Sequence, residues 1–73
     1  MGEAVETYYD GQAWHNRVRR RGPLPGTYRS REAACEVGRH EARVRGVDHV
    51  VRRPDGSVAE RNRYPRRSEE IPG

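Results

Sequence analysis

Residues 30–46, SREAACEVGRHEARVRG, decide the fold, because they combine helical periodicity with a signal at each helix end. Ser30 is a good N-cap residue, and Gly46 stands where a left-handed residue commonly ends a helix. Only Gly38 interrupts a run that otherwise lacks glycine and proline. The stretch therefore predicts one helix over residues 31–45.

This helix has two different sides on a helical wheel. The charged side carries Glu32, Glu36, Arg39, His40 and Arg43. The other side is small or apolar and carries Ala33, Ala34, Cys35, Val37, Gly38, Ala42 and Val44. Because Ala34, Gly38 and Ala42 recur every four residues, they line up along the helix. So narrow a line of side chains would let the helix backbone lie close to a sheet.

Two charged residues, Glu41 and Arg45, fall within the apolar arc of this helix. They are one turn apart, in the order that favours an ion pair. An unpaired carboxylate would be costly to bury at this position. Either the pair satisfies itself at the edge of the sheet, or this surface meets a partner or a second subunit.

The segments on both sides of the helix have the composition of β-hairpins. Residues 5–9 are β-branched and aromatic, an Asp-Gly turn follows, and a second strand extends over about 14–20. Residues 22–26 contain two prolines and two glycines, which predicts a loop. Residues 47–53 and 57–63 flank a Pro-Asp-Gly turn and are predicted to form a second hairpin.

The order of these elements predicts an α+β fold. We expect a small antiparallel β-sheet (hairpin, short strand, then C-terminal hairpin) with one α-helix packed on one face, in the order ββ(β)αββ. Residues 1–64 are predicted to form a single domain. Residues 65–73 are polar, contain two prolines and show no periodicity, which is typical of a disordered tail.

The composition indicates a thin core. The chain has 73 residues, of which Leu, Ile, Val and Phe together supply ten, so we expect a dimer or a marginally stable monomer. Cys35 is the single cysteine, which excludes an intramolecular disulfide and a four-thiolate metal site. The acidic N-terminus has no apolar signal region, and no apolar run is long enough to span a bilayer. We therefore expect a cytoplasmic protein with no membrane partner.

Arginine supplies all fifteen cationic side chains other than histidine. The candidates for nucleic-acid contacts are Arg17, Arg19, Arg20, Arg21, Arg52 and Arg53. Guanidinium groups bind phosphate bidentately and need no fixed base sequence to do so. The first four follow Trp14 and His15, and alternate members would form a row of cations on one face of a strand. The alternative is a solvated surface on which the acids of residues 1–13 are the partners.

The sequence carries no residue cluster typical of an enzyme. It has no Gly-rich phosphate loop after a strand, no nucleophile elbow and no carboxylate pair in a defined frame. His15, His40 and His49 lack metal-ligand spacing with one another. We therefore predict a non-enzymatic protein with no catalytic residues, cofactor or metal. Its first predicted role is a protein-interaction module that binds another protein or a second copy. The alternative is a nucleic-acid-binding module for DNA or RNA.

Several short motifs follow one another across most of the chain. They are Trp14, Val18, residues 27–34 (TYRSREAA), Gly46, Val50-Val51, residues 55–58 (DGSV) and residues 61–64 (RNRY). Over residues 5–64 the chain resembles a bacterial family of short proteins, domain of unknown function 2188. The resemblance implies a sheet with one helix and brings no catalytic residues. Glu41 departs from it, because the family tends to be apolar there. A weaker similarity runs to the strand-strand-strand-helix modules of phage integrases, which lay a sheet on DNA.

Overall fold

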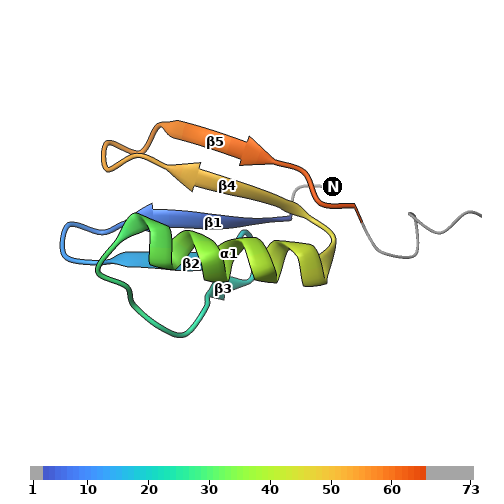
Figure 1. The fold of residues 1–73 in the computed structure, drawn as a ribbon, viewed down its shortest axis with the longest axis horizontal. Helices are drawn as coiled ribbons and strands as arrows, with labels where there is room; N and C mark the ends of the chain where they lie inside the picture. The colour runs from blue at the N-terminus through green and yellow to red at the C-terminus, as the bar shows by residue number, and fades with distance from the viewer. Residues whose placement is uncertain (1–2, 66–73) are drawn as a thin grey trace, which may run out of the picture.

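One α-helix lies against one face of a five-stranded sheet in the computed structural model, which describes residues 3–65 (Figure 1). The elements are β1 (Ala4–Tyr9), β2 (Trp14–Val18), β3 (Gly22–Pro23), α1 (Arg31–Arg45), β4 (Asp48–Arg52) and β5 (Val58–Asn62). The sheet order is β3-β2-β1-β4-β5. The α+β fold and the element order are confirmed. Apart from Pro65, the predicted tail lies outside the described residues.

The helix begins and ends where its capping residues predict. The hydroxyl oxygen of Ser30 accepts a hydrogen bond from the backbone N–H of Ala33 at 3.1 Å. Gly46 has a φ of 70°, and its N–H donates to the carbonyls of Ala42 and Arg43. Both ends of α1 thus satisfy backbone groups that a bare helix would leave without partners.

The central strand pair is parallel, so the expectation of a wholly antiparallel sheet is wrong at this position. The other three pairs are antiparallel, but β1 and β4 run in the same direction, with Ala4 beside Asp48. The helix explains this arrangement. The chain enters α1 beside the start of β2, where Tyr28 bridges Trp14. Fifteen helical residues span about 22 Å, and they return the chain to the end of the sheet where β1 begins.

The second strand is shorter than its composition predicts. It ends at Val18, and Arg19, Arg20 and Arg21 form the turn to β3, where Arg20 adopts a φ of 73°. The prediction of a row of arginines along one strand is therefore wrong beyond Arg17, because the next three arginines lie in the turn. The predicted loop at 22–26 begins with the two residues of β3, which include a proline at the edge of the sheet, where a missing N–H is tolerated.

The small stripe is the part of α1 that is buried against the sheet. Ala34, Gly38 and Ala42 are buried, as predicted. Val44 is 70 % exposed and Ala33 is also exposed, so their assignment to the buried side is wrong. The reason is geometric: a helix this close to the sheet touches it along one line, and the flanking side chains point outward. The apolar core is correspondingly small. One cluster in it joins Val5, Val18 and Ala42, with Leu24, Val47 and Tyr64 packed against them.

A buried polar cluster lies directly under Gly38. The Thr7 hydroxyl donates to Asn16 Oδ1 at 2.6 Å, and the Asn16 amide nitrogen donates to the carbonyl of Ala34 at 3.0 Å. His49 Nε2 lies 2.8 Å from the same Thr7 oxygen. Because the single hydroxyl proton goes to Asn16, His49 must donate through Nε2. The three strands β1, β2 and β4 are thus joined to the helix by hydrogen bonds at this point.

Burial of His49 makes stability depend on pH. Burial, with a smaller contribution from Arg39, lowers the pKa of His49 below its ordinary value of 6.5, although Glu60 acts in the opposite direction. The unfolded chain therefore binds a proton as pH falls through 6.5, while the folded chain does not. We expect the free energy of unfolding to fall below pH 6.5 by up to about 1.4 kcal/mol per pH unit, until the folded pKa is reached.

Urea denaturation followed by circular dichroism between about pH 7.5 and 5.5, above the range where carboxylates titrate, measures this dependence. The variant His49→Gln is the control, because it keeps a donor near Thr7 and cannot titrate. Wild type should lose stability across this range relative to the variant. Equal pH profiles for the two proteins would show that His49 does not govern the dependence.

Candidate functional site

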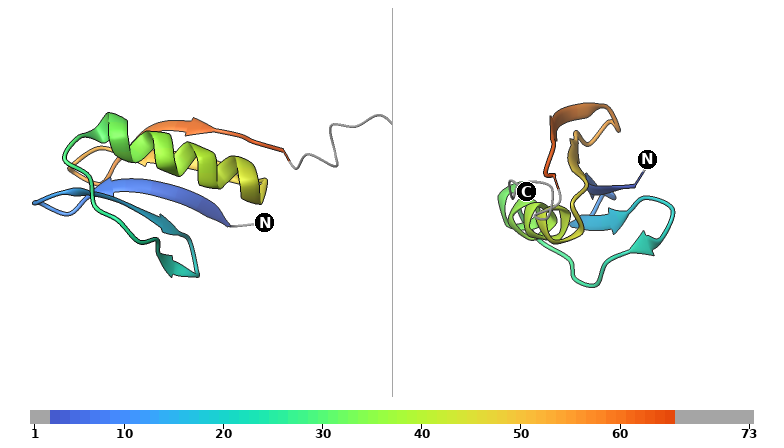
Figure 2. Two further views of the ribbon diagram at one scale, coloured as in Figure 1. Left: turned by 60° about the horizontal axis from the view of Figure 1, so that its bottom comes forward. Right: turned by 90° about the vertical axis from the view of Figure 1, so that its right-hand side faces the viewer.

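The helix α1 covers one face of the sheet and leaves the opposite face uncovered (Figure 2). We call this opposite face the open face. Glu6 on β1 lies at the centre of this open face, because it alternates with Val5 and Thr7, which face α1. Its direct partner on β2 is Arg17, and Arg52 approaches it from β4 on the other side. Three neighbouring strands therefore place one guanidinium group on each side of the Glu6 carboxylate.

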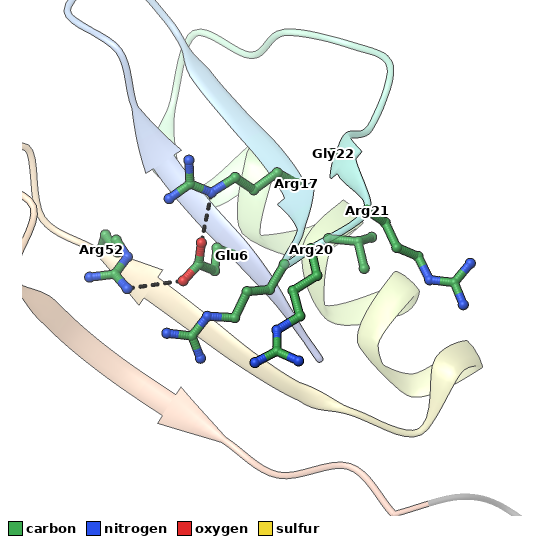
Figure 3. A pocket seen from close by; sticks show the side chains of 8 residues that line it. Glu6, Arg17, Arg20, Arg21, Gly22 and Arg52 are labelled. Atoms are coloured by element: carbon green, nitrogen blue, oxygen red, sulfur yellow. Dashed lines mark hydrogen bonds and ion pairs between the residues drawn. The ribbon is translucent and has the colours of Figure 1, made fainter. Parts of the chain in front are cut away.

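Both guanidinium groups hydrogen-bond Glu6 (Figure 3). Arg17 Nε donates to Oε1 at 2.7 Å, and Arg52 Nη2 donates to Oε2 at 2.9 Å. The Glu6 side chain is only 4 % exposed, against 44 % for Arg17 and 25 % for Arg52. Burial raises the pKa of Glu6, but the hydrogen bonds and charges of the two arginines outweigh burial, so the pKa lies below its ordinary value. Glu6 is therefore ionised at neutral pH and holds both arginines in place.

An open depression of about 530 Å³ adjoins this cluster. Its lining residues are Glu6, Arg17, Val18, Arg19, Arg20, Arg21, Gly22 and Arg52 (Figure 3). Five arginines against one glutamate give the lining a formal charge of +4. The whole chain has fifteen arginines and eleven acids, also +4, so ten arginines and ten acids elsewhere cancel. The lining of the depression thus carries a formal charge equal to the net charge of the whole protein. A surface with this charge can bind an anion.

The turn between β2 and β3 positions three of these arginines. The N–H of Arg19 donates to the carbonyl of Ala4 at 2.8 Å, and the N–H of Arg21 donates to the carbonyl of Val18 at 2.9 Å. Arg21 Nε also pairs with Glu3 at 2.9 Å. Arg19 and Arg20 form no ion pair with any residue that the structure describes. Among the five arginines that line the depression, these two are therefore the most available to a ligand.

Five of the six predicted contact residues line the depression, and Arg53 does not. Its Nη1 donates to Ser57 Oγ at 3.2 Å and to the carbonyl of Val58 at 2.9 Å, so Arg53 stabilises the turn of its own hairpin. On the helix, Arg45 Nε pairs with Glu41 at 3.2 Å. This contact is the one expected if Glu41 and Arg45 neutralise each other's charge.

Sequence reasoning missed two parts of this face. It did not place Glu6 between two arginines, because Arg52 is 46 residues away in sequence and reaches Glu6 only through the parallel β1–β4 pair. It also did not find an aromatic pair on the open face. Tyr8 and His15 are direct cross-strand partners, with ring centroids 5.5 Å apart and an interplanar angle of 26°. The guanidinium carbon of Arg17 lies 4.7 Å from the centroid of the Tyr8 ring.

The β1–β2 turn fixes the position of His15. His15 Nε2 lies 2.6 Å from Asp10 Oδ2. The other oxygen of Asp10 accepts the backbone N–H groups of Gln12 and Ala13 at 2.8 and 2.9 Å. Hydrogen bonds from Ala13 and then Gln12 lower the pKa of Asp10 to about 2. Asp10 is therefore ionised at neutral pH and orients the imidazole.

Two features of the described residues bear on other ligands. Within residues 3–65, no three His, Cys, Asp or Glu side chains form a group that could hold a metal ion. The absence of a metal and of a cofactor stays a prediction. The part of the chain that the structure describes has no helix long and apolar enough to cross a membrane.

Comparison with known proteins assigns a family. Neither the curated proteins nor the solved structures contain a match to this chain. The family model described as "Uncharacterized protein conserved in bacteria (DUF2188)" matches residues 5–64. This range contains four complete strands, the helix and all but the first residue of β1, and it confirms the resemblance seen in the sequence. The chain therefore belongs to DUF2188, a bacterial family whose description states no function.

Proposed function

We propose that this protein is a non-enzymatic module that binds nucleic acid through its phosphate groups. The observation that carries the proposal is the depression on the open face, where five arginines and one glutamate account for a formal charge of +4. Arginine is the side chain best suited to phosphate, because its planar fork of donors matches two phosphate oxygens. The cytoplasmic location and the lack of enzymatic activity stay predictions from the sequence.

The ion pairs of Glu6 support a binding role for its arginines. Arg17 uses its Nε on Glu6 and retains the N–H donors of both Nη groups. Arg52 uses one Nη on Glu6 and the other on the carbonyl of Gly56, so only the second N–H of each Nη remains for a ligand. Glu6 orders these side chains before a ligand arrives, which lowers the entropic cost of binding, but its negative charge also competes with a phosphate for the same guanidinium groups. Arg19 and Arg20 add two cations beside them on the same depression.

A protein-interaction module is the second candidate. The observation that favours it is β5, an edge strand with an exposed Val58. An edge strand can add a strand from another protein or a second copy. This strand has only five residues and carries Glu60 and Arg61, and short charged edges are typical of strands that avoid such pairing. The arginine depression is the stronger of the two features.

The salt dependence of binding tests the nucleic-acid proposal. Each phosphate neutralised adds about 0.7–0.9 to the slope of log affinity against log salt. If Arg19 and Arg20 each contact one phosphate, the double variant Arg19→Gln/Arg20→Gln should lower that slope by about 1.4–1.8. The measurement is fluorescence anisotropy with labelled single-stranded and duplex oligonucleotides between about 50 and 200 mM salt.

The matched control is Arg29→Gln/Arg39→Gln. It removes the same charge from two exposed positions that do not line the depression. The slope of log affinity against log salt for this control should stay close to that of wild type. The only change expected is the small one caused by the lower overall charge. Equal losses in the two double variants would show that net charge, and not the depression, sets the affinity. Absence of binding at about 10⁻⁴ M, the weak end of non-specific binding, would reject the proposal and favour the protein-interaction module.

A further inference from the structure

We propose that Tyr8 and His15 form a base-stacking platform on the open face, so that the ligand is single-stranded nucleic acid. This inference rests on the proposed function, because it assigns the bases of a ligand whose phosphates occupy the arginine depression. It adds the class of nucleic acid and two residues that contact it. The support comes from the placement of the aromatic pair, its link to the arginines and its rigidity.

The two rings lie on the same face as the arginine cluster. Residues that alternate along a strand share a face, so Tyr8 lies on the side of Glu6, and His15 on the side of Arg17. At about 3.3 Å per residue, Tyr8 and Glu6 are about 7 Å apart along β1. Neither ring belongs to the apolar core between the sheet and α1. Both residues are half-buried, so part of each is accessible to a ligand.

Arg17 joins the platform to the depression. Its guanidinium group lies over the Tyr8 ring at 4.7 Å, donates to Glu6 and also lines the depression. A strand of nucleic acid crossing the sheet from β1 to the β2–β3 turn would therefore meet aromatic rings first and unpaired arginines next. Stacking platforms beside a basic groove are how proteins bind single strands without a fixed sequence.

The stack also discriminates against a duplex. Bases in a double helix stack on one another, so their faces are not available to protein side chains, whereas unpaired bases can stack on aromatic rings. The platform is ordered before binding, since Asp10 anchors His15 and the Asp10 carboxylate is itself held by two backbone N–H groups. A preordered ring costs little entropy when a base stacks on it.

The test compares Tyr8→Leu with Tyr8→Phe on single-stranded oligothymidylate. The leucine keeps apolar volume and lacks a ring, while the phenylalanine keeps the ring. From the range measured for base–aromatic stacking, we expect Tyr8→Leu to weaken affinity about 5-fold to 100-fold, and Tyr8→Phe to retain it. The slope of affinity against salt should not change in Tyr8→Phe, which keeps the ring under the Arg17 guanidinium group, and should fall by no more than one phosphate contact, about 0.7–0.9, in Tyr8→Leu. Tyr9→Leu, the same type of change on the helix side of β1, is the control and should bind as wild type does once circular dichroism confirms its fold.

A second probe keeps the test independent of any folding defect. Wild-type protein is titrated with oligothymidylate and with an abasic strand of the same length, which carries the same phosphates and no bases. Tighter binding of oligothymidylate than of the abasic strand and of duplex supports the platform. Equal, salt-dependent binding of all three would overturn the platform and leave the phosphate-binding function standing. Binding of none of the three would overturn both proposals.

Discussion

Replacing Gly38 with leucine is expected to remove more than half of the protein's free energy of unfolding. A Cβ at this position would lie 2.6 Å from Asn16 Oδ1 and 2.7 Å from both His49 Nε2 and Thr7 Oγ1. Overpacking commonly costs about 1–3 kcal/mol and occasionally more. We expect more than 3 kcal/mol here, because the three polar atoms are fixed by hydrogen bonds and cannot move aside separately. So small a domain has a total stability near the lower limit of about 5 kcal/mol.

The variant Gly38→Ala separates packing from helix propensity. Alanine favours an exposed helix over glycine by about 1 kcal/mol, so a helix that faced solvent here would become more stable. We expect a lower melting temperature instead, because even one methyl group meets the polar cluster. Ala33→Leu, at an exposed position of the same helix, is the control for the leucine and should fold normally. A raised melting temperature for Gly38→Ala would contradict the close approach of α1 to the sheet.

The helix could be predicted from the sequence because its signals are local. Ser30 and Gly46 act on their own backbone neighbours, and the small stripe through Gly38 follows from a period that α-helices always have. Each of these features is set within a few residues. The same is true of the turn residues that predict the two hairpins.

The features that could not be predicted depend on contacts between distant segments. The parallel pairing of β1 and β4 follows from the path of the helix, which no local pattern encodes. Thr7, Asn16 and His49 come from three different strands, and each alone is typical of an exposed strand position. Val44 is exposed because the helix meets the sheet along one line, whereas a helical wheel gives a whole arc.

The candidate site shows the same division. The composition identified the arginines as a group, but the turn that ends β2 at Val18 gathers Arg19 and Arg20 around a depression, where a continued strand would have placed them on opposite faces. Glu6 was hidden because an acid in a β-prone segment carries no signal of its partners. Its role depends on an arginine from β4, which only the sheet order brings near.

Glu6→Gln is expected to destabilise the protein and, at the same time, to strengthen its binding to nucleic acid. Glutamine has the same shape, but one carboxylate oxygen becomes an N–H₂ group, which cannot accept a hydrogen bond from arginine. Arg52 is the more affected partner, because its Nε is already buried without a hydrogen bond to any residue the structure describes. Breaking a buried ion pair by removing one charge costs about 3–5 kcal/mol. We expect about 3 kcal/mol, since both arginines retain some exposure to water.

The same change raises the formal charge of the depression from +4 to +5 and frees donors that Glu6 now occupies. Affinity for oligonucleotide should therefore rise and its salt dependence should become steeper. Glu3→Gln is the matched control: it removes the same charge beside Arg21, but from an exposed pair, so its stability should change little.

Urea denaturation and anisotropy on the same preparations measure both quantities. Weaker binding by folded Glu6→Gln would show that Glu6 serves the site by holding Arg17 and Arg52 in place more than it competes with phosphate for them. A wild-type free energy of unfolding for Glu6→Gln would instead show that the arginines do not depend on the carboxylate. If stability falls while affinity rises, the Glu6 carboxylate stabilises the fold and lowers the affinity for nucleic acid. Such a trade-off is expected where a binding site gathers like charges that destabilise the folded protein.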